Sequence, residues 1–159
     1  MHLVRNTLPR PHDRQGYVTM ERIVIGVGNR DRGDDAAGIA VAERVTGTIS
    51  HVVPTGAMDL YELWTAHDSV VIIDAMRSDA AVGTVRRFDV SATPLPSETF
   101  ASTHSFGPAA GIEIARALGR LPTSIEVIGI EVGGLAVGSA MSEPVEAAVD
   151  DLATELSDA

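Results

Sequence analysis

Residues 23–35 read Ile-Val-Ile-Gly-Val-Gly-Asn-Arg-Asp-Arg-Gly-Asp-Asp, so an apolar run passes through a glycine turn into an acidic segment. The run from residue 22 to 27 is rich in β-branched residues and apolar after Arg22, which is typical of a strand buried on both faces. Asp34 and Asp35 then precede a helical pattern at residues 36–45, where acids complement the positive end of the helix dipole. This segment therefore predicts a strand, a tight turn and a helix in direct succession.

The same alternation continues along the rest of the chain. Apolar runs predict strands, periodic segments predict helices, and a polar–apolar alternation predicts a half-exposed edge strand. The strands are expected at residues 48–53, 69–73 and 125–131, the edge strand at 83–89, and the helices at 58–66, 107–118 and from about 143 to 156, with Ser142 as the cap of the last.

Alternating strands and helices predict an α/β, three-layer fold: a mostly parallel, twisted, five-stranded sheet with helices on both faces. In a doubly wound order, the strands at residues 22–27 and 69–73 are neighbours, and a crevice opens at their carboxyl ends.

The amino-acid composition alone excludes several classes of functional site and partner. The chain has 159 residues, a formal net charge of −10, and no cysteine or lysine. Disulfides, thiolate metal sites and a cysteine nucleophile are therefore excluded, and nucleic acids or anionic membranes are disfavoured as partners because both require a basic face.

The organisation of the chain is expected to be simple. Residues 21–159 are predicted to form one domain, and residues 1–20, rich in Arg, His and Pro, a disordered leader or extension. No apolar run approaches the length of a membrane span, so a cytoplasmic location is expected. A monomer is expected too, because no long exposed apolar stripe demands a partner.

Three polar residues stand where hydrophobic segments give way to turns: Asp35, Asp74 and His104. Two carboxylates and an imidazole at one edge of a sheet would form a site for a hard-to-borderline divalent metal ion. Each residue also has a structural interpretation. Asp35 could cap its helix unless Asp34 does so, Asp74 could cap the next loop or pair with Arg77, and His104 could cap the following helix.

Two other site classes fit the sequence less well. The turn Gly26-Val-Gly-Asn is similar to a dinucleotide-binding fingerprint, but Asp31 stands where a third glycine is needed, and nearby acids would repel a pyrophosphate. Ser102 and Ser105 lie near His104, but the sequence has no Gly-x-Ser-x-Gly elbow, so a serine hydrolase is disfavoured. A nucleotide-binding domain stays a distant alternative.

With these residues in view, the chain resembles the [NiFe]-hydrogenase maturation endopeptidase family. The matching segments, in the family's order, are Ile25-Gly-Val-Gly-Asn with Gly33-Asp-Asp-Ala-Ala-Gly, Thr55-Gly-Ala-Met-Asp-Leu, Val71-Ile-Ile-Asp-Ala, Gly83-Thr-Val, Thr103-His and Val127-Ile-Gly-Ile-Glu. The resemblance implies removal of a C-terminal extension from the hydrogenase large-subunit precursor after nickel insertion. It also implies that Asp35, Asp74 and His104 contact the metal, and that Thr55 and Gly56 lie in a loop that accommodates substrate.

The implied metal is nickel carried by the precursor. No stably bound cofactor is expected, although zinc, cadmium or calcium could fill such a site adventitiously. One departure stands out: Val52-Val-Pro-Thr55 replaces the glycine-richer Asp-Gly-Gly-Thr type of relatives. It motivates a second hypothesis, a non-catalytic, metal-dependent checkpoint or binding protein of hydrogenase assembly.

Overall fold

The computed structural model describes residues 22–53, 57–64, 67–96 and 107–159. The predicted leader at residues 1–20 lies outside this part of the chain and stays a prediction. No helix within the described ranges is long and apolar enough to cross a membrane. The elements, in chain order, are β1 Arg22–Val27, the 3₁₀ helix η1 Gly33–Ala36, α1 Ala37–Arg44, β2 Ile49–Val53, α2 Ala57–Trp64, β3 Ser69–Met76, β4 Val85–Asp89, α3 Pro108–Ala117, β5 Ser124–Glu131 and α4 Glu143–Asp158.

The strands form one five-stranded sheet in the order β2-β1-β3-β5-β4. The pairs β1–β2, β1–β3 and β3–β5 are parallel, whereas β4 runs antiparallel to β5 at the edge. The mixed α/β fold expected from the sequence is thus confirmed, and the alternating segment at residues 85–89 is an edge strand as predicted.

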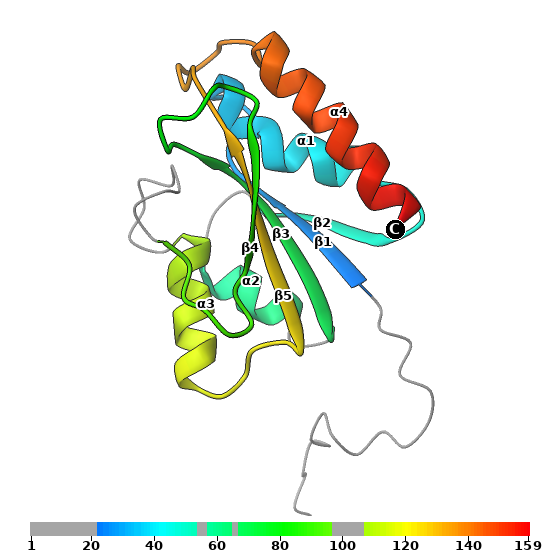
Figure 1. Cartoon of the computed structure of the whole chain (residues 1–159), viewed down its shortest axis with the longest axis vertical. Coiled ribbons are helices and arrows are strands. Elements are labelled where there is room, and N and C mark those ends of the chain that lie inside the picture. The colour runs from blue at the N-terminus through cyan, green and yellow to red at the C-terminus, as the bar shows by residue number, and fades with distance from the viewer. Residues whose placement is uncertain (1–21, 54–56, 65–66, 97–106) are drawn as a thin grey trace, which may run out of the picture.

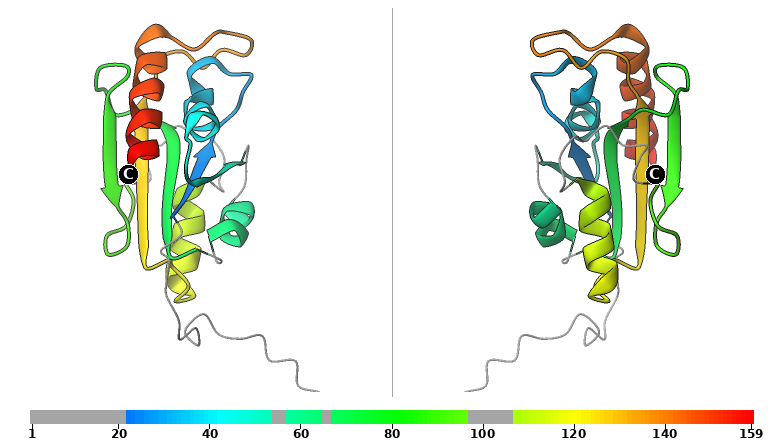
Figure 2. Two further views of the ribbon diagram at one scale, coloured as in Figure 1. Left: turned by 90° about the vertical axis from the view of Figure 1, so that its right-hand side faces the viewer. Right: turned by 90° about the vertical axis from the view of Figure 1, so that its left-hand side faces the viewer.

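The helices lie in pairs on opposite faces of the sheet (Figure 1). Helices α1 and α4 pack together on one face, and α2 and α3 pack together on the other, as the edge-on views also show (Figure 2). Because α1 follows β1 and α2 follows β2, successive crossovers change face, while β1 lies between β2 and β3. The carboxyl ends of β1 and β3 are therefore the switch point where a crevice is expected.

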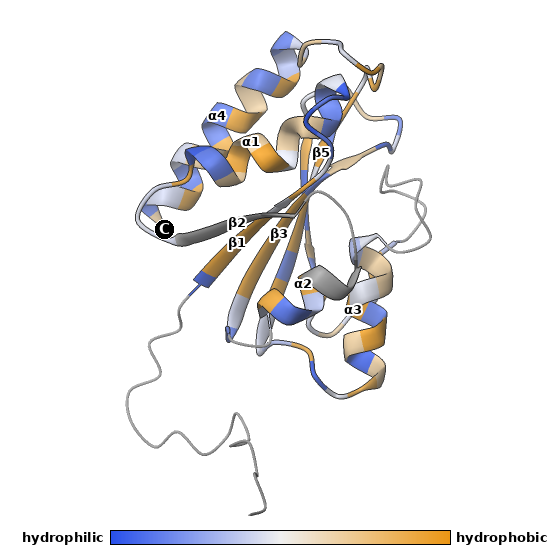
Figure 3. Ribbon diagram, turned by 180° about the vertical axis from the view of Figure 1, so that it is seen from behind, coloured by the Kyte–Doolittle hydropathy of each residue, from blue (hydrophilic) through white to orange (hydrophobic). Residues whose placement is uncertain are grey.

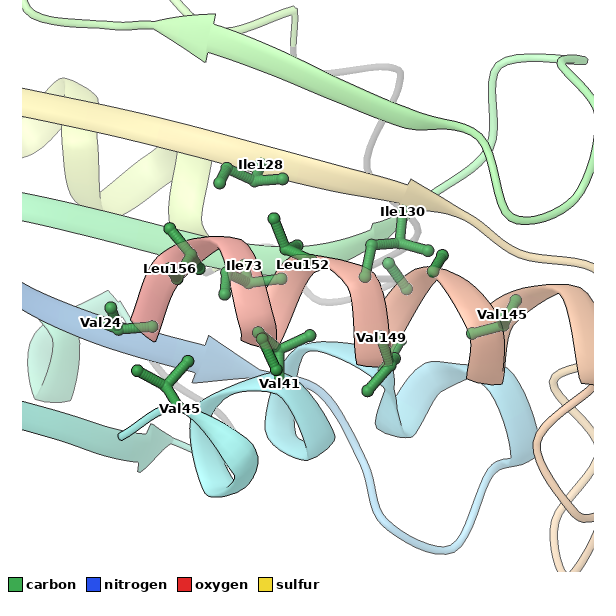
Figure 4. Packing of buried hydrophobic residues seen from close by; sticks show 14 of the residues in the cluster. Val24, Val41, Val45, Ile73, Ile128, Ile130, Val145, Val149, Leu152 and Leu156 are labelled. Atoms are coloured by element: carbon green, nitrogen blue, oxygen red, sulfur yellow. The ribbon is translucent and has the colours of Figure 1, made fainter. Parts of the chain in front are cut away.

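Each face of the sheet buries its own apolar cluster. Apolar residues dominate the central strands, and α4 is polar on its outer side (Figure 3). Residues of α4 at helical spacing point onto the sheet and α1, forming an apolar stripe that covers Ile73, Ile128 and Ile130 (Figure 4). This stripe consists of Val145, Val149, Leu152 and Leu156. The domain thus has two hydrophobic layers, with the sheet between them.

Two glycines let α1 lie directly on the strands. A Cβ on Gly38 would stand 2.2 Å from the carbonyl oxygen of Ile73 and 2.5 Å from that of Val27. A Cβ on Gly26 would stand 2.1 Å from the carbonyl oxygen of Gly38. The backbone of α1 therefore touches both β1 and β3 at the switch point, and this contact fixes where η1 lies.

Two sequence predictions were wrong in detail. Strand β3 does not end before Asp74 but continues to Met76, because pairing with β5 persists after pairing with β1 has ended at Ile73. Ser142 occupies the N-cap position of α4 but makes no side-chain capping bond there. Its hydroxyl donates to Asp34 instead, at 3.0 Å.

Replacing Gly38 with Ala should lower the free energy of unfolding by about 3 kcal/mol, because the added methyl group forces α1 away from two strand carbonyls. Urea unfolding followed by circular dichroism measures the loss. Gly134→Ala is the matched control, because nothing lies within 4 Å of a Cβ at Gly134. Equal stability of the two variants would contradict the close packing of α1.

Candidate functional site

Asp74 is a buried carboxylate inside β3, with only 2% of its surface exposed. It lies just beyond the last residue of β3 that pairs with β1, and it pairs with Gly129 of β5. Side chains alternate along a strand, so Asp74 shares a face with Ile72 and Met76, which belong to the cluster beneath α2 and α3. The sequence therefore places a carboxylate at the switch point, on the face that α2 and α3 cover.

The surroundings of Asp74 compensate its charge poorly. Its Oδ1 accepts a hydrogen bond of 2.8 Å from the backbone N–H of Ala75, whereas its Oδ2 is buried with no hydrogen-bond partner. The pKa of Asp74 is raised to about 7, and burial is the main cause. The Ala75 N–H opposes this rise, and the negative charge of Asp35 adds to it. Arg77 does not pair with Asp74, since its guanidinium donates to the carbonyl of Gly133 at 3.1 Å.

Asp35 lies in η1 and is half-buried, close enough to Asp74 to act on its pKa. The turn that precedes η1 folds back on itself, because the N–H of Asn29 donates to the Asp35 carbonyl at 3.2 Å. Gly28 has φ +148°, and a Cβ there would stand 2.0 Å from that same carbonyl oxygen. The glycine turn thus makes room for the protein's own backbone, which accounts for its likeness to a dinucleotide fingerprint.

Asp34 does not cap the helix that follows it, contrary to one reading of the sequence. Its carboxylate accepts hydrogen bonds from the N–H groups of Gly133 (2.9 Å), Gly134 (3.2 Å) and Ser142 (2.7 Å), and from the Ser142 hydroxyl. Burial opposes the ionisation of Asp34, but these donors outweigh it and lower its pKa. Asp34 therefore ties the segment 133–142, which we call the β5–α4 loop, to η1.

Glu131 is a third buried acid, which the sequence analysis did not single out. It ends β5 with 4% of its surface exposed, and accepts hydrogen bonds from the N–H of Ser78 (2.9 and 3.0 Å) and its hydroxyl (2.8 Å). The signal was present, because a charged residue closes an apolar run there just as Asp74 does. Glu131 fixes the turn that follows β3.

Of the predicted site residues, the structure brings Asp35 and Asp74 together. His104, Thr55 and Gly56 lie outside the described residues, so their places in the site stay predictions. Within the described ranges, no group of three or more His, Asp or Glu side chains could hold a metal ion. The unsatisfied Oδ2 of Asp74 beside a second carboxylate does suit a divalent cation, which would supply the missing compensation.

The raised pKa of Asp74 predicts a pH-dependent stability for the metal-free chain. In the folded chain Asp74 binds a proton more tightly than in the unfolded chain. The free energy of unfolding is therefore highest below about pH 4, and it falls as the pH rises through about 7. Asp74→Asn stays neutral and should escape this loss. Measured by urea unfolding in EDTA, the advantage of Asp74→Asn over the parent should therefore grow by on the order of 3–4 kcal/mol between pH 4 and pH 8. A constant difference would mean that Asp74 ionises normally.

Comparison with known proteins agrees with this geometry. The sequence pattern of the hydrogenase maturation protease family matches residues 54–159, which is more than half of the chain and includes Asp74. No curated protein sequence gives a significant match.

Several solved structures share the fold. The [NiFe] hydrogenase maturation protease HybD from Thermococcus kodakarensis is 26% identical, with a TM-score of 0.72 over 87% of this chain and 98% of the other. The hydrogenase maturating endopeptidase HybD from E. coli is 23% identical, with a TM-score of 0.72 over 86% and 90%. The maturation protease HycI from T. kodakarensis KOD1 is 24% identical, with a TM-score of 0.66 over 87% and 91%.

The family pattern covers most of the chain, and the fold is shared with a solved maturation protease over 87% of it. This chain belongs to the hydrogenase maturation protease family.

Proposed function

We propose that this chain is a metal-dependent endopeptidase that removes the C-terminal extension of a [NiFe]-hydrogenase large-subunit precursor after nickel has been inserted. The observation that carries the proposal is the buried Oδ2 of Asp74, which has no hydrogen-bond partner and lies near Asp35 at the switch point. A carboxylate kept uncompensated there weakens the fold, and such groups gather at functional sites. A cytoplasmic location and a monomeric state remain part of this proposal.

The nickel ion belongs to the substrate in this proposal. Asp35, Asp74 and His104 complete its coordination, so a precursor loaded with nickel is joined to the enzyme by the ion itself. An empty precursor lacks that link and binds more weakly. Thr55 and Gly56, just ahead of α2, contact the precursor segment beside the ion.

The chemistry is hydrolysis of one peptide bond. A water molecule adds to the scissile carbonyl carbon, the C–N bond breaks, and a proton passes to the departing amine. The cation polarises the carbonyl oxygen or the water, and one carboxylate of the pair orients the water and takes its proton. The pKa of about 7 belongs to Asp74 in the metal-free chain; a cation bound beside Asp74 would lower this pKa and hold the side chain as a carboxylate.

Replacing any one of the three proposed ligands should abolish processing. We expect Asp35→Ala, Asp74→Ala and His104→Ala each to lower the cleavage rate at least about a hundredfold while the fold stays intact, because each removes a ligand or proton acceptor. Mass spectrometry of the purified precursor after incubation measures cleavage, and circular dichroism checks folding. His51→Ala is the neutral control. Full processing by all three variants would reject the site.

The state of the precursor should decide whether it is cleaved. With the parent chain, nickel-loaded precursor should be shortened, and nickel-free precursor should stay at full length. Equal cleavage of the two forms would contradict recognition through the ion. Nickel-dependent binding without any change in precursor mass would instead favour the checkpoint hypothesis.

A further inference from the structure

Two arginines lie at the carboxyl edge of the sheet, next to the acids of the candidate site. Arg77 follows β3 three residues after Asp74, and Arg32 precedes η1 three residues before Asp35. Both side chains reach the β5–α4 loop: Arg77 donates to the carbonyl of Gly133 at 3.1 Å, and Arg32 to that of Leu135 at 3.3 Å. These two carbonyls are two positions apart in the chain, and so short a segment spans at most about 7 Å. The two guanidinium groups are therefore held along one short stretch of backbone.

The backbone around both arginines is fixed by hydrogen bonds. Glu131 holds the turn at Ser78, directly after Arg77, through three contacts of 2.8–3.0 Å. On the other side, the N–H of Arg32 donates to the carbonyl of Asn29 at 3.3 Å. Asp34 fixes the β5–α4 loop against which both side chains rest. Pre-organised groups of this kind lose little conformational freedom when they bind a ligand.

Neither arginine pairs with an acid of the described chain. Of the described arginines, Arg30, Arg44, Arg87 and Arg116 form ion pairs, whereas Arg22, Arg86 and Arg120, like Arg32 and Arg77, form none. No ion pair within the described ranges includes Arg32 or Arg77, although Asp31 and Asp79 are close in sequence. The chain has 22 acidic and 12 basic residues, so partners are plentiful. Within the part of the chain that the structure describes, the side chains of Arg32 and Arg77 donate only to the two loop carbonyls.

We propose that Arg77 and Arg32 form a subsite that binds a carboxylate of the precursor close to the cleaved bond. This inference rests on the proposed function and adds a specificity determinant to it. Each guanidinium donates one hydrogen bond to the loop, through Nη2 of Arg77 and Nε of Arg32. A guanidinium carries five N–H donors in a planar fork that matches the two oxygens of a carboxylate. The contact aligns the precursor along the carboxyl edge of the sheet and leaves the hydrolytic step to the acids, so it acts on KM.

Arg77→Gln should raise KM for nickel-loaded precursor about tenfold and leave kcat within twofold of the parent, because it removes one charge-assisted contact made by bound substrate. Arg77→Lys, which keeps the charge but loses the fork, should give a smaller rise. Arg120→Gln is the matched control: Arg120 is exposed, donates to the Tyr61 hydroxyl at 3.2 Å and follows α3 at the opposite end of the sheet. An unchanged KM for Arg77→Gln, or an equal rise for Arg120→Gln, would overturn the subsite.

Changes in the precursor identify the source of the carboxylate. Neutralising Asp and Glu side chains within the extension should raise KM if a side chain is bound. Lengthening the extension by two glycines should raise it if the terminal carboxylate is bound. Whichever change acts on the parent should have a smaller effect on Arg77→Gln, because the contact made by Arg77 is already lost there. If neither change affects the parent, the proposal fails.

A binding measurement separates this inference from the proposed function. The peptide acetyl-Asp-Glu-Asp-amide, titrated into the ¹⁵N-labelled chain, should shift the arginine Nε–H resonances of Arg77 and Arg32 and not that of Arg120. Arg77→Gln should weaken this binding. Shifts at Arg120 alone, or no shifts, would reject the subsite even if the chain cleaves precursor. Normal cleavage by Asp35→Ala and Asp74→Ala together with the expected shifts would instead reject only the proposed catalytic site.

Discussion

The contact between α1 and the two central strands controls both the fold and the site. Gly38 touches the carbonyls of Val27 and Ile73 without a side chain between them, and Gly26 makes the reciprocal approach from β1. Any larger residue would lift the start of α1 away from the sheet. Since η1 leads directly into α1, this contact also determines how near Asp35 lies to Asp74. The close packing of α1 on the sheet thus determines how the carboxylates of Asp35 and Asp74 are placed relative to each other.

Hydrogen bonds between residues far apart in the sequence hold η1 and the β5–α4 loop together at the carboxyl edge of the sheet. The carboxylate of Asp34 receives the N–H groups of Gly133, Gly134 and Ser142, about a hundred positions later. A loop that contributes few apolar contacts is thereby held in one conformation at the beginning of α4. Rigid elements on either side of the crevice make a precise site possible on segments that would otherwise move.

The sequence was most informative where residue patterns are local. The continuous apolar runs located β1, and the alternation at residues 85–89 located the edge strand correctly. The sequence predictions were wrong where a contact with a distant segment determines the local structure. The end of β3 depends on its pairing with β5, and the hydroxyl of Ser142 donates to Asp34 instead of capping its own helix. The proximity of Asp35 and Asp74 was predicted from topology alone, because parallel strands deliver their carboxyl ends to one edge.

Asp34 and Asp74 show how the same side chain takes different roles in one small region. Asp34 is surrounded by four donors, so burial does not prevent its ionisation and its charge holds structure together. Asp74 is as little exposed but lies deeper in the protein, and it has one donor and a negative neighbour, so its pKa is raised to about 7. A residue serving only stability would have gained donors or been replaced by an apolar one, since an unsatisfied buried oxygen costs free energy. The unpartnered Oδ2 of Asp74 is therefore the feature on which the proposed metal site depends.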